Sequence, residues 1–331
     1  MLSAVGTFVA AFGLLVHIAD ASSASGSFTS NHVDIPRIGL GTWLSDKDKV
    51  SDAVEHALSS GYTHIDAALI YGNEVEVGKG IAAAGVPRSD IWVTSKLWNA
   101  DHRPAEARAA IEKTISDLGV GYLDLYLIHW PVAFVPGKGT KIDHHAPNTW
   151  RTLENLVRAN LTRYIGISNF APKGVEEVLQ TCTICPYAHE FEAHPYLQQQ
   201  EFVDFHAEKG IKVIAYSPLA NTNPTYDSGI PALLKDPFWK ALAKKKNATV
   251  AQAVLAWGIQ RGTIVIPKSV HNDYIDENLG SVGITFTEQE MRAIAKEDRK
   301  HRMNDPGKSW GVDLFEGLDD PTTPKDAFEE L

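Results

Sequence analysis

The sequence predicts one α/β domain, a (β/α)8 TIM barrel with two extra helices. Three observations support this prediction. The chain has 331 residues of which 44% are apolar, so it can bury a large core. From about residue 35 onward, eight short strand-like runs alternate with helical stretches. Gly or Pro lies near many boundaries, and no Pro/Ser-rich linker divides the series, which favours a closed parallel barrel over two domains.

The predicted elements follow one another regularly along the chain. The strands are expected at 37–42, 62–66, 91–96, 122–130, 163–168, 187–192, 212–217 and 263–269. Helices are expected among the intervening stretches, at 47–60, 104–118, 149–159, 172–180, 199–209 and 249–260. The extra helices, 237–246 and 287–302, depart from strict alternation. The barrel is therefore expected to occupy residues 28–315, followed by a polar tail at 316–331.

Residues 1–27 are expected to form an extension, either a signal peptide or a disordered leader. Residues 1–18 carry no charged side chain, and the apolar stretch within them resembles that of a signal peptide. However, no Lys or Arg precedes the stretch, and a spanning helix would need about 20 apolar residues. Asn160 and Asn247 begin glycosylation sequons, which often occur by chance. A cytoplasmic protein is predicted, with secretion or anchoring through residues 1–21 as the alternative.

Composition excludes several classes of protein. The 31 basic and 41 acidic residues give a net charge of −10, which argues against a nucleic-acid binder. Two cysteines rule out a scaffold stapled by several disulfides, and they favour a reducing compartment. We expect no redox or metal role for Cys182 and Cys185, because a lone C-x-x-C before the sixth strand lies at the barrel bottom.

Two further motifs are not expected to carry chemistry. His189 and His194 resemble a zinc motif, but a spacing of five on a strand points the imidazoles to opposite faces. We therefore predict no metal site. Asp143, His144 and His145 lie in a loop flanked by Gly and Pro and are expected to be solvated.

Four chemically matched residues fall near the carboxyl ends of predicted strands, where barrels place their active sites. Asp66, Lys96 and His129 end strands two, three and four or lie close to their ends, and Tyr71 follows Asp66 by five residues. Tyrosine, with an ordinary pKa of about 10, needs a nearby cation before it becomes an effective acid–base group at neutral pH. Lys96 could lower the pKa of Tyr71, while Asp66 orients Lys96 and His129 positions a carbonyl oxygen. This set suits carbonyl reduction.

The same residues lie in motifs that resemble the aldo-keto reductases. The longest is GYTHIDAALIYGNE at 61–74, which contains Asp66 and Tyr71. The resemblance continues in order through GLGTW at 39–43, SKLW at 95–98, LIHW at 127–130, GISNF at 166–170, HPYL at 194–197, AYSPL at 215–219 and IPKS at 266–269. It implies a barrel that binds a nicotinamide cofactor across its rim, with Tyr71 as the proton donor.

The resemblance also implies a cofactor site for NADPH. Ser168 and Asn169 would hold the carboxamide, Tyr216 would stack on the nicotinamide, and Lys268 and Ser269 would meet the 2′-phosphate. The whole implied set is Gly41, Thr42, Ser168, Asn169, Glu190, Tyr216, Ser217, Leu219, Lys268, Ser269, Glu277 and Asn278.

Two departures from the family pattern bear on cofactor binding. Tyr274 stands where the family usually has an Arg that grips the 2′-phosphate, and a phenol cannot replace a bidentate guanidinium. NADH use is therefore possible. Glu190 stands where the family usually has a Gln that binds the carboxamide, and an ionised carboxylate cannot donate a hydrogen bond. We expect altered cofactor binding.

The resemblance implies an aromatic substrate pocket of Trp43, Trp98, Trp130 and Trp310. Such a pocket suits neutral aldehydes or ketones. The prediction is a monomeric NADPH-dependent reductase of small carbonyl compounds, reversible as an alcohol dehydrogenase. The alternatives are a cofactor-binding regulatory subunit of the same fold and a secreted barrel hydrolase, for which Glu190 and Glu192 would supply the carboxylates.

Overall fold

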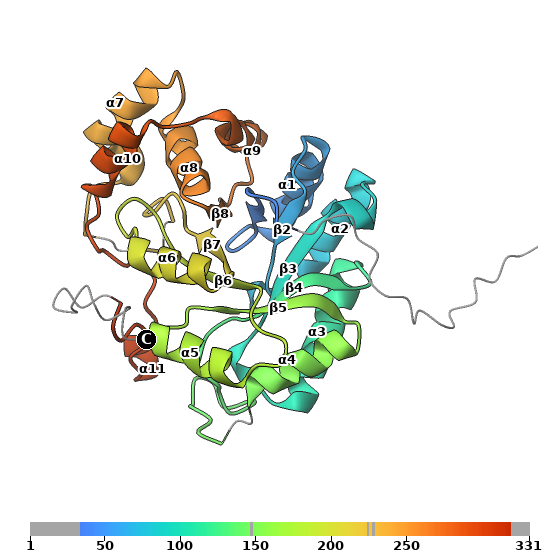
Figure 1. Cartoon of the computed structure of the whole chain (residues 1–331). Helices are drawn as coiled ribbons and strands as arrows, with labels where there is room; N and C mark the ends of the chain where they lie inside the picture. Colours follow the sequence, from blue (N-terminus) through green and yellow to red (C-terminus); the bar gives the residue numbers. More distant parts are fainter. Residues whose placement is uncertain (1–33, 146–147, 224, 227–228, 319–331) are drawn as a thin grey trace, which may run out of the picture.

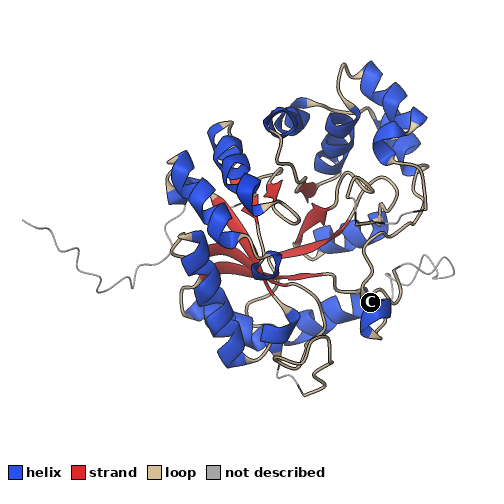
Figure 2. Cartoon of the chain, turned by 180° about the vertical axis from the view of Figure 1, so that it is seen from behind, coloured by secondary structure: helices blue, strands red, loops and turns tan. Residues whose placement is uncertain are grey.

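Eight parallel strands form one curled sheet in the order β1 to β8, surrounded by helices (Figures 1 and 2). The structure is a computed structural model that describes residues 34–145, 148–223, 225–226 and 229–318. The strands are β1 (Leu40–Gly41), β2 (His64–Asp66), β3 (Trp92–Leu97), β4 (Leu123–Ile128), β5 (Thr162–Ser168), β6 (Ala188–Glu192), β7 (Lys212–Tyr216) and β8 (Thr263–Val265). Parallel bridges from Ile38 to Val265 and from Gly41 to Lys268 join the first strand to the last. The predicted barrel is therefore confirmed.

Helices lie on the outside of the sheet, as Figure 2 shows. They are α1 (Lys47–Ser59), α2 (Glu74–Ala84), α3 (Pro104–Leu118), α4 (Thr149–Arg158), α5 (Pro172–Thr181), α6 (Gln200–Glu208), α7 (Pro237–Lys245), α8 (Val250–Gln260), α9 (Asn272–Leu279), α10 (Glu288–Ala295) and α11 (Gly307–Trp310). The extra helices predicted at 237–246 and 287–302 correspond to α7 and α10, although α10 ends seven residues earlier, at Ala295. Helices α2 and α9 and the short α11 were not among the predicted segments.

Local sequence signals explain where several helices begin and end. Pro104 starts α3, where a missing N–H costs nothing, and Gly119 ends it in the left-handed conformation with φ 66°. Thr249 begins α8 with a capping box, since its side chain accepts from the N–H of Gln252 while the Gln252 side chain accepts from the N–H of Thr249. These signals place the loops that carry the site.

Aromatic packing fills one part of the barrel interior. The Trp92 ring is fully buried and stacks on Tyr164 with ring centroids 5.6 Å apart, and Tyr164 stacks on Tyr187 at 4.1 Å. Arg163 lies over the Tyr164 ring at 5.3 Å. The three stacked rings give the core rigid, close-packed contacts between β3, β5 and the segment before β6.

The structure corrects the prediction made for one loop residue and adds a disulfide. Asp143 is 7% exposed and pairs with Arg103, whose Nη2 lies 2.8 Å from the carboxylate, so it is not solvated. The hydrogen bond from Arg103 lowers the pKa of Asp143. His144 and His145 are exposed, as predicted. Cys182 and Cys185 form a disulfide, a bond that the sequence analysis did not predict.

The two histidines of the apparent zinc motif have separate partners. His189 accepts a hydrogen bond from the N–H of Phe170, whereas His194 pairs with Glu192 at 2.8 Å. Within the described part of the chain, no group of three or more His, Cys, Asp or Glu side chains could hold a metal ion.

Among the described residues, no helix is long and apolar enough to cross a membrane. The leader predicted at 1–27 lies outside the described residues.

Candidate active site

A cavity of about 730 Å³ opens at the carboxyl ends of the strands and brings the predicted site residues together. Asp66, Tyr71 and His129 line one part of it, and Lys268, Glu277 and Asn278 line another. All twelve residues predicted for the cofactor and all four predicted pocket tryptophans line this one cavity. The cavity is within the usual size range of small-molecule sites.

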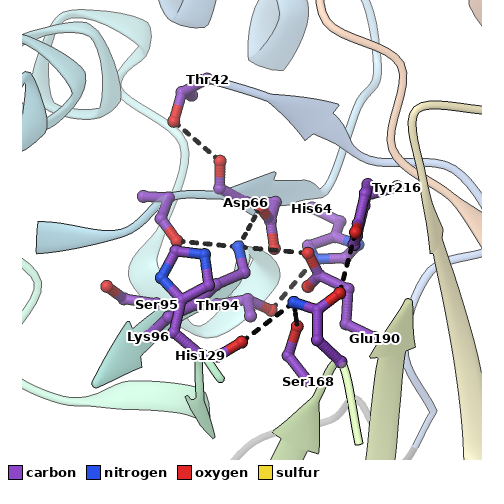
Figure 3. A network of polar contacts seen from close by, with 12 residues as sticks. Thr42, His64, Asp66, Thr94, Ser95, Lys96, His129, Ser168, Glu190 and Tyr216 are labelled. Carbon is purple, nitrogen blue, oxygen red and sulfur yellow. Dashed lines mark hydrogen bonds and ion pairs between the residues drawn. The ribbon is translucent and has the colours of Figure 1, made fainter. Parts of the chain in front are cut away.

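Lys96 lies between two carboxyl groups in the interior of the barrel. Its side chain is fully buried, and Nζ lies 2.5 Å from Oδ1 of Asp66 and 3.4 Å from Oε1 of Glu190. Nζ also donates to the carbonyl oxygen of Ala67 at 3.1 Å. Figure 3 shows the dashed lines from Lys96 to both carboxyl groups. Neighbouring strands β2 and β3 supply Asp66 and Lys96, so barrel register fixes the ion pair.

The charges around Tyr71 act against one another. The Lys96 ammonium lies 5.3 Å from the centre of the Tyr71 ring. Burial raises the pKa of Tyr71 above its usual value, Lys96 lowers it, and Asp66 and Glu190 raise it again. Lys96 thus lowers the pKa of Tyr71 in the predicted direction, but in the protein alone burial outweighs this effect. Tyr71 is a protonated phenol at neutral pH, which is the state a proton donor needs.

His129 is a neutral imidazole on the cavity wall. Burial lowers its pKa well below the usual value, and the nearby Lys96 charge lowers it further. The His129 ring meets Tyr71 edge to face with centroids 5.8 Å apart. A neutral imidazole retains one N–H, so His129 can donate a hydrogen bond to a carbonyl oxygen without carrying charge.

A hydrogen-bonded network fixes the residues on β5 and β7. The side-chain amide of Asn169 donates to the carbonyl oxygen of His129 and to Oγ of Ser168, both at 3.0 Å, and its oxygen accepts from the Tyr216 hydroxyl at 2.8 Å. Asn169 and Ser217 both have positive φ, at 61° and 47°. Strained backbone of this kind clusters at functional sites.

The tryptophans of the cavity wall pack against one buried ring, Phe134, that sequence analysis missed. Trp310 meets Trp130 and Phe134 with centroids 5.2 Å apart in each case, and Trp98 meets His129 at 5.3 Å. Phe134 lies in a loop outside the recognised motifs, so only its proximity to the tryptophans identifies it. This end of the cavity is therefore lined by closely packed aromatic rings and is apolar.

The far end of the cavity is formed by the segment after β8 and by α9. Lys268 is exposed, whereas Ser269 is held by contacts with the N–H and carbonyl groups of His271. Tyr274 is 58% exposed and its ring meets the His271 ring at 5.5 Å. His271 was not among the predicted residues, although it also lines the cavity.

Glu192 anchors the chain segment that leads to Trp310. Its carboxylate accepts from the N–H groups of Met303 and Asn304, both at 2.9 Å, and from His194 at 2.8 Å. Burial alone would raise the pKa of Glu192, but these donors and nearby cations lower it. Glu192 is thus committed to structure, which leaves the hydrolase alternative without its second free carboxylate.

The family to which the sequence is similar agrees with this geometry. The family model described as "Aldo/keto reductase family" matches residues 37–299. The chain therefore belongs to the aldo/keto reductase family, a class of oxidoreductases that act on small-molecule carbonyl compounds with a nicotinamide cofactor.

Similar proteins occur in organisms as different as a yeast, a mammal and an insect. An uncharacterized oxidoreductase of Schizosaccharomyces pombe is 44% identical over 301 residues, covering 87% of this chain and 93% of that protein. Aldo-keto reductase family 1 member A1 of Sus scrofa is 42% identical, covering 78% and 85%. The solved structure of Bombyx mori aldo-keto reductase in complex with NADP superposes with a TM-score of 0.80 at 33% identity, covering 85% and 95%.

Proposed function

We propose that this protein is an NADPH-dependent reductase of aldehydes or ketones, with Tyr71 as the proton donor. The observation that carries the proposal is the convergence of Tyr71, His129 and the Asp66–Lys96 pair on one cavity that continues to Lys268 and Ser269. The aromatic wall supports neutral carbonyl substrates.

The residues present fit a nicotinamide dinucleotide. Ser168, Asn169 and Glu190 lie beside one another on the cavity wall, where a carboxyl oxygen of Glu190 would accept from the nicotinamide carboxamide. Lys268 and Ser269 offer a cation and a hydroxyl for the 2′-phosphate. Bound NADPH would supply a hydride to the carbonyl carbon. Glu277 and Asn278 would lie near the adenine, and Gly41, Thr42, Ser217 and Leu219 would line the path between the ends.

The chain's own residues would manage the proton. His129 donates a hydrogen bond to the carbonyl oxygen and holds it near Tyr71. The Tyr71 hydroxyl gives its proton to that oxygen as the alcohol forms. Lys96, held charged by its close partner Asp66, stabilises the phenolate that remains. Although burial alone would lower the pKa of Lys96, Asp66 raises it above its usual range, and Glu190 adds to this effect only when it is ionised.

The test is Tyr71→Phe. Turnover of NADPH with an aldehyde should fall by about 10² or more, the usual loss when a general acid is removed. The dissociation constant for NADPH should stay near that of the wild type. The matched control is Tyr62→Phe, because Tyr62 is a buried tyrosine whose hydroxyl donates only to the carbonyl oxygen of Ile275. Near-native turnover in Tyr71→Phe would contradict the assignment.

A cytoplasmic location forms part of the same proposal, because NADPH is an intracellular reductant. The intact mass of the protein from its native host should then show no sugar at Asn160 or Asn247. A mature chain that starts near Ser22 and carries sugar would contradict it.

A further inference from the structure

Glu190 adds a second carboxyl group to a site that already balances one carboxylate against one ammonium. Asp66, Lys96 and Glu190 are each 2% exposed or less. Lys96 lies 2.5 Å from Asp66 and 3.4 Å from Glu190, so both carboxyl groups approach the same cation. If both were ionised, a net charge of −1 would be buried without compensation, which is costly.

A shared proton resolves this imbalance. Oδ2 of Asp66 and Oε2 of Glu190 are both buried, and neither meets an N–H or O–H donor elsewhere in the described chain. The two side chains are close enough to hydrogen bond when Glu190 carries a proton. Burial and the Asp66 charge raise the pKa of Glu190 well above its usual range, while Lys96 opposes them. Burial raises the pKa of Asp66 as well, but Asp66 makes the closer contact with the Lys96 ammonium, at 2.5 Å against 3.4 Å, so Glu190 is the carboxyl group that keeps the proton.

The remaining surroundings of Glu190 leave this pairing undisturbed. Its register partners on the adjacent strands are neutral, Ser168 on β5 and Ile214 on β7. The titratable and charged groups that face it or its partners are Asp66 on β2, Lys96 on β3, Tyr71, His64, His129 and Glu192. His64 and His129 are neutral because burial and Lys96 lower the pKa of each, and Glu192 is occupied by its own donors.

We propose that Glu190 couples a proton to the oxidation state of the bound cofactor, remaining a neutral acid beside NADPH and releasing its proton to solvent when NADP⁺ binds. The inference rests on the proposed function. As a neutral acid, Glu190 offers a carbonyl oxygen to the carboxamide while its hydroxyl donates to Asp66, so it substitutes for an amide side chain. The oxidised nicotinamide ring is cationic, and an ionised Glu190 on the same cavity wall would stabilise that charge.

Linkage fixes the direction of the pH dependence. The pKa of Glu190 is raised in the protein alone, and a cationic ring would lower it. Between these two values NADP⁺ binds more tightly as pH rises, by up to about tenfold per pH unit, because binding expels a proton. NADPH carries no charge on its ring, so its affinity should not change through Glu190 in that window.

The experiment measures proton release as each cofactor is added to the full-length protein in weakly buffered solution with an indicator dye. NADP⁺ should release up to one proton per site from the wild type, and NADPH should release none. Glu190→Gln keeps the size and shape of the side chain, so it should bind both cofactors and lose the release. Dissociation constants from quenching of tryptophan fluorescence would show the matching pH slope in the wild type alone.

Two further variants separate the sources of a proton. Glu74→Gln is the matched control, since Glu74 is also 2% exposed and burial raises its pKa. Unlike Glu190, Glu74 accepts hydrogen bonds from the hydroxyls of Ser95 and Thr114. Release should persist in this variant and in Tyr71→Phe. Release that survives in Glu190→Gln or disappears in Tyr71→Phe would overturn the inference and assign the proton to Tyr71. Failure to bind either cofactor would instead contradict the proposed function.

Discussion

The replacement of the usual Arg by Tyr274 makes cofactor preference a quantitative test of the far end of the cavity. Lys268 and Ser269 remain to meet a 2′-phosphate, one by a charged contact and the other by a hydroxyl. A hydrogen bond to a charged group contributes about 1.5 to 3 kcal/mol, which corresponds to about 10- to 100-fold in affinity. Lys268 is exposed, so solvent screening favours the lower end of that range.

We therefore expect NADPH to bind about tenfold more tightly than NADH. Lys268→Ala should nearly abolish this margin, whereas Tyr274→Arg should increase it by restoring a bidentate donor. Tyr274 itself is half exposed and available to stack on adenine, which stabilises both cofactors alike. The measurement is the ratio of the two dissociation constants from tryptophan quenching. A wild-type ratio that favours NADH, or one that Lys268→Ala leaves unchanged, would refute the assignment.

Two further predictions concern stability. Gly78→Ala should destabilise the protein by about 1 to 3 kcal/mol, because a Cβ there would lie 2.5 Å from the carbonyl oxygen of Asp117. The midpoint of thermal unfolding of this variant, compared with that of the wild type, measures the loss. Glu154→Gln should cost about 1 kcal/mol at neutral pH. Burial alone would raise the pKa of Glu154, but the N–H groups of Ile184 and Thr183 lower it below its usual value. Its contribution is therefore present at neutral pH and is lost as pH falls through that lowered pKa. Urea midpoints of both proteins should converge in acid.

The barrel and most of its site follow from local patterns, which explains why they could be predicted. Strand-ending polar residues at intervals of one β/α unit place Asp66, Lys96 and His129 on one rim whatever the details of packing. Helix α2 escaped prediction because Gly78 and Gly80 weaken its helical pattern. The structure shows why glycine is needed there, since a Cβ on Gly80 would collide with α1.

The remaining errors come from contacts that only the folded chain makes. Asp143 lies in a polar loop, and nothing in its neighbourhood in sequence points to Arg103, forty residues away. The net shift of the Tyr71 pKa depends on burial and on Glu190 from β6. The effect of the nearby Lys96 alone therefore did not predict the direction of that shift. The sequence could predict that Asp66 and Lys96 pair. It could not predict which of the three buried groups Asp66, Lys96 and Glu190 are ionised in the folded protein.

The anchor at Glu192 does not depend on which side chains follow it in the chain. Trp310 and the segment around it reach the cavity from beyond the last barrel strand, and that segment is fastened to β6 through main-chain N–H groups at positions 303 and 304. Main-chain groups are present whatever the side chains, so substitutions after the anchor leave the fastening intact. A substitution at Trp310 should therefore change the aromatic wall of the cavity without loosening the segment that carries it.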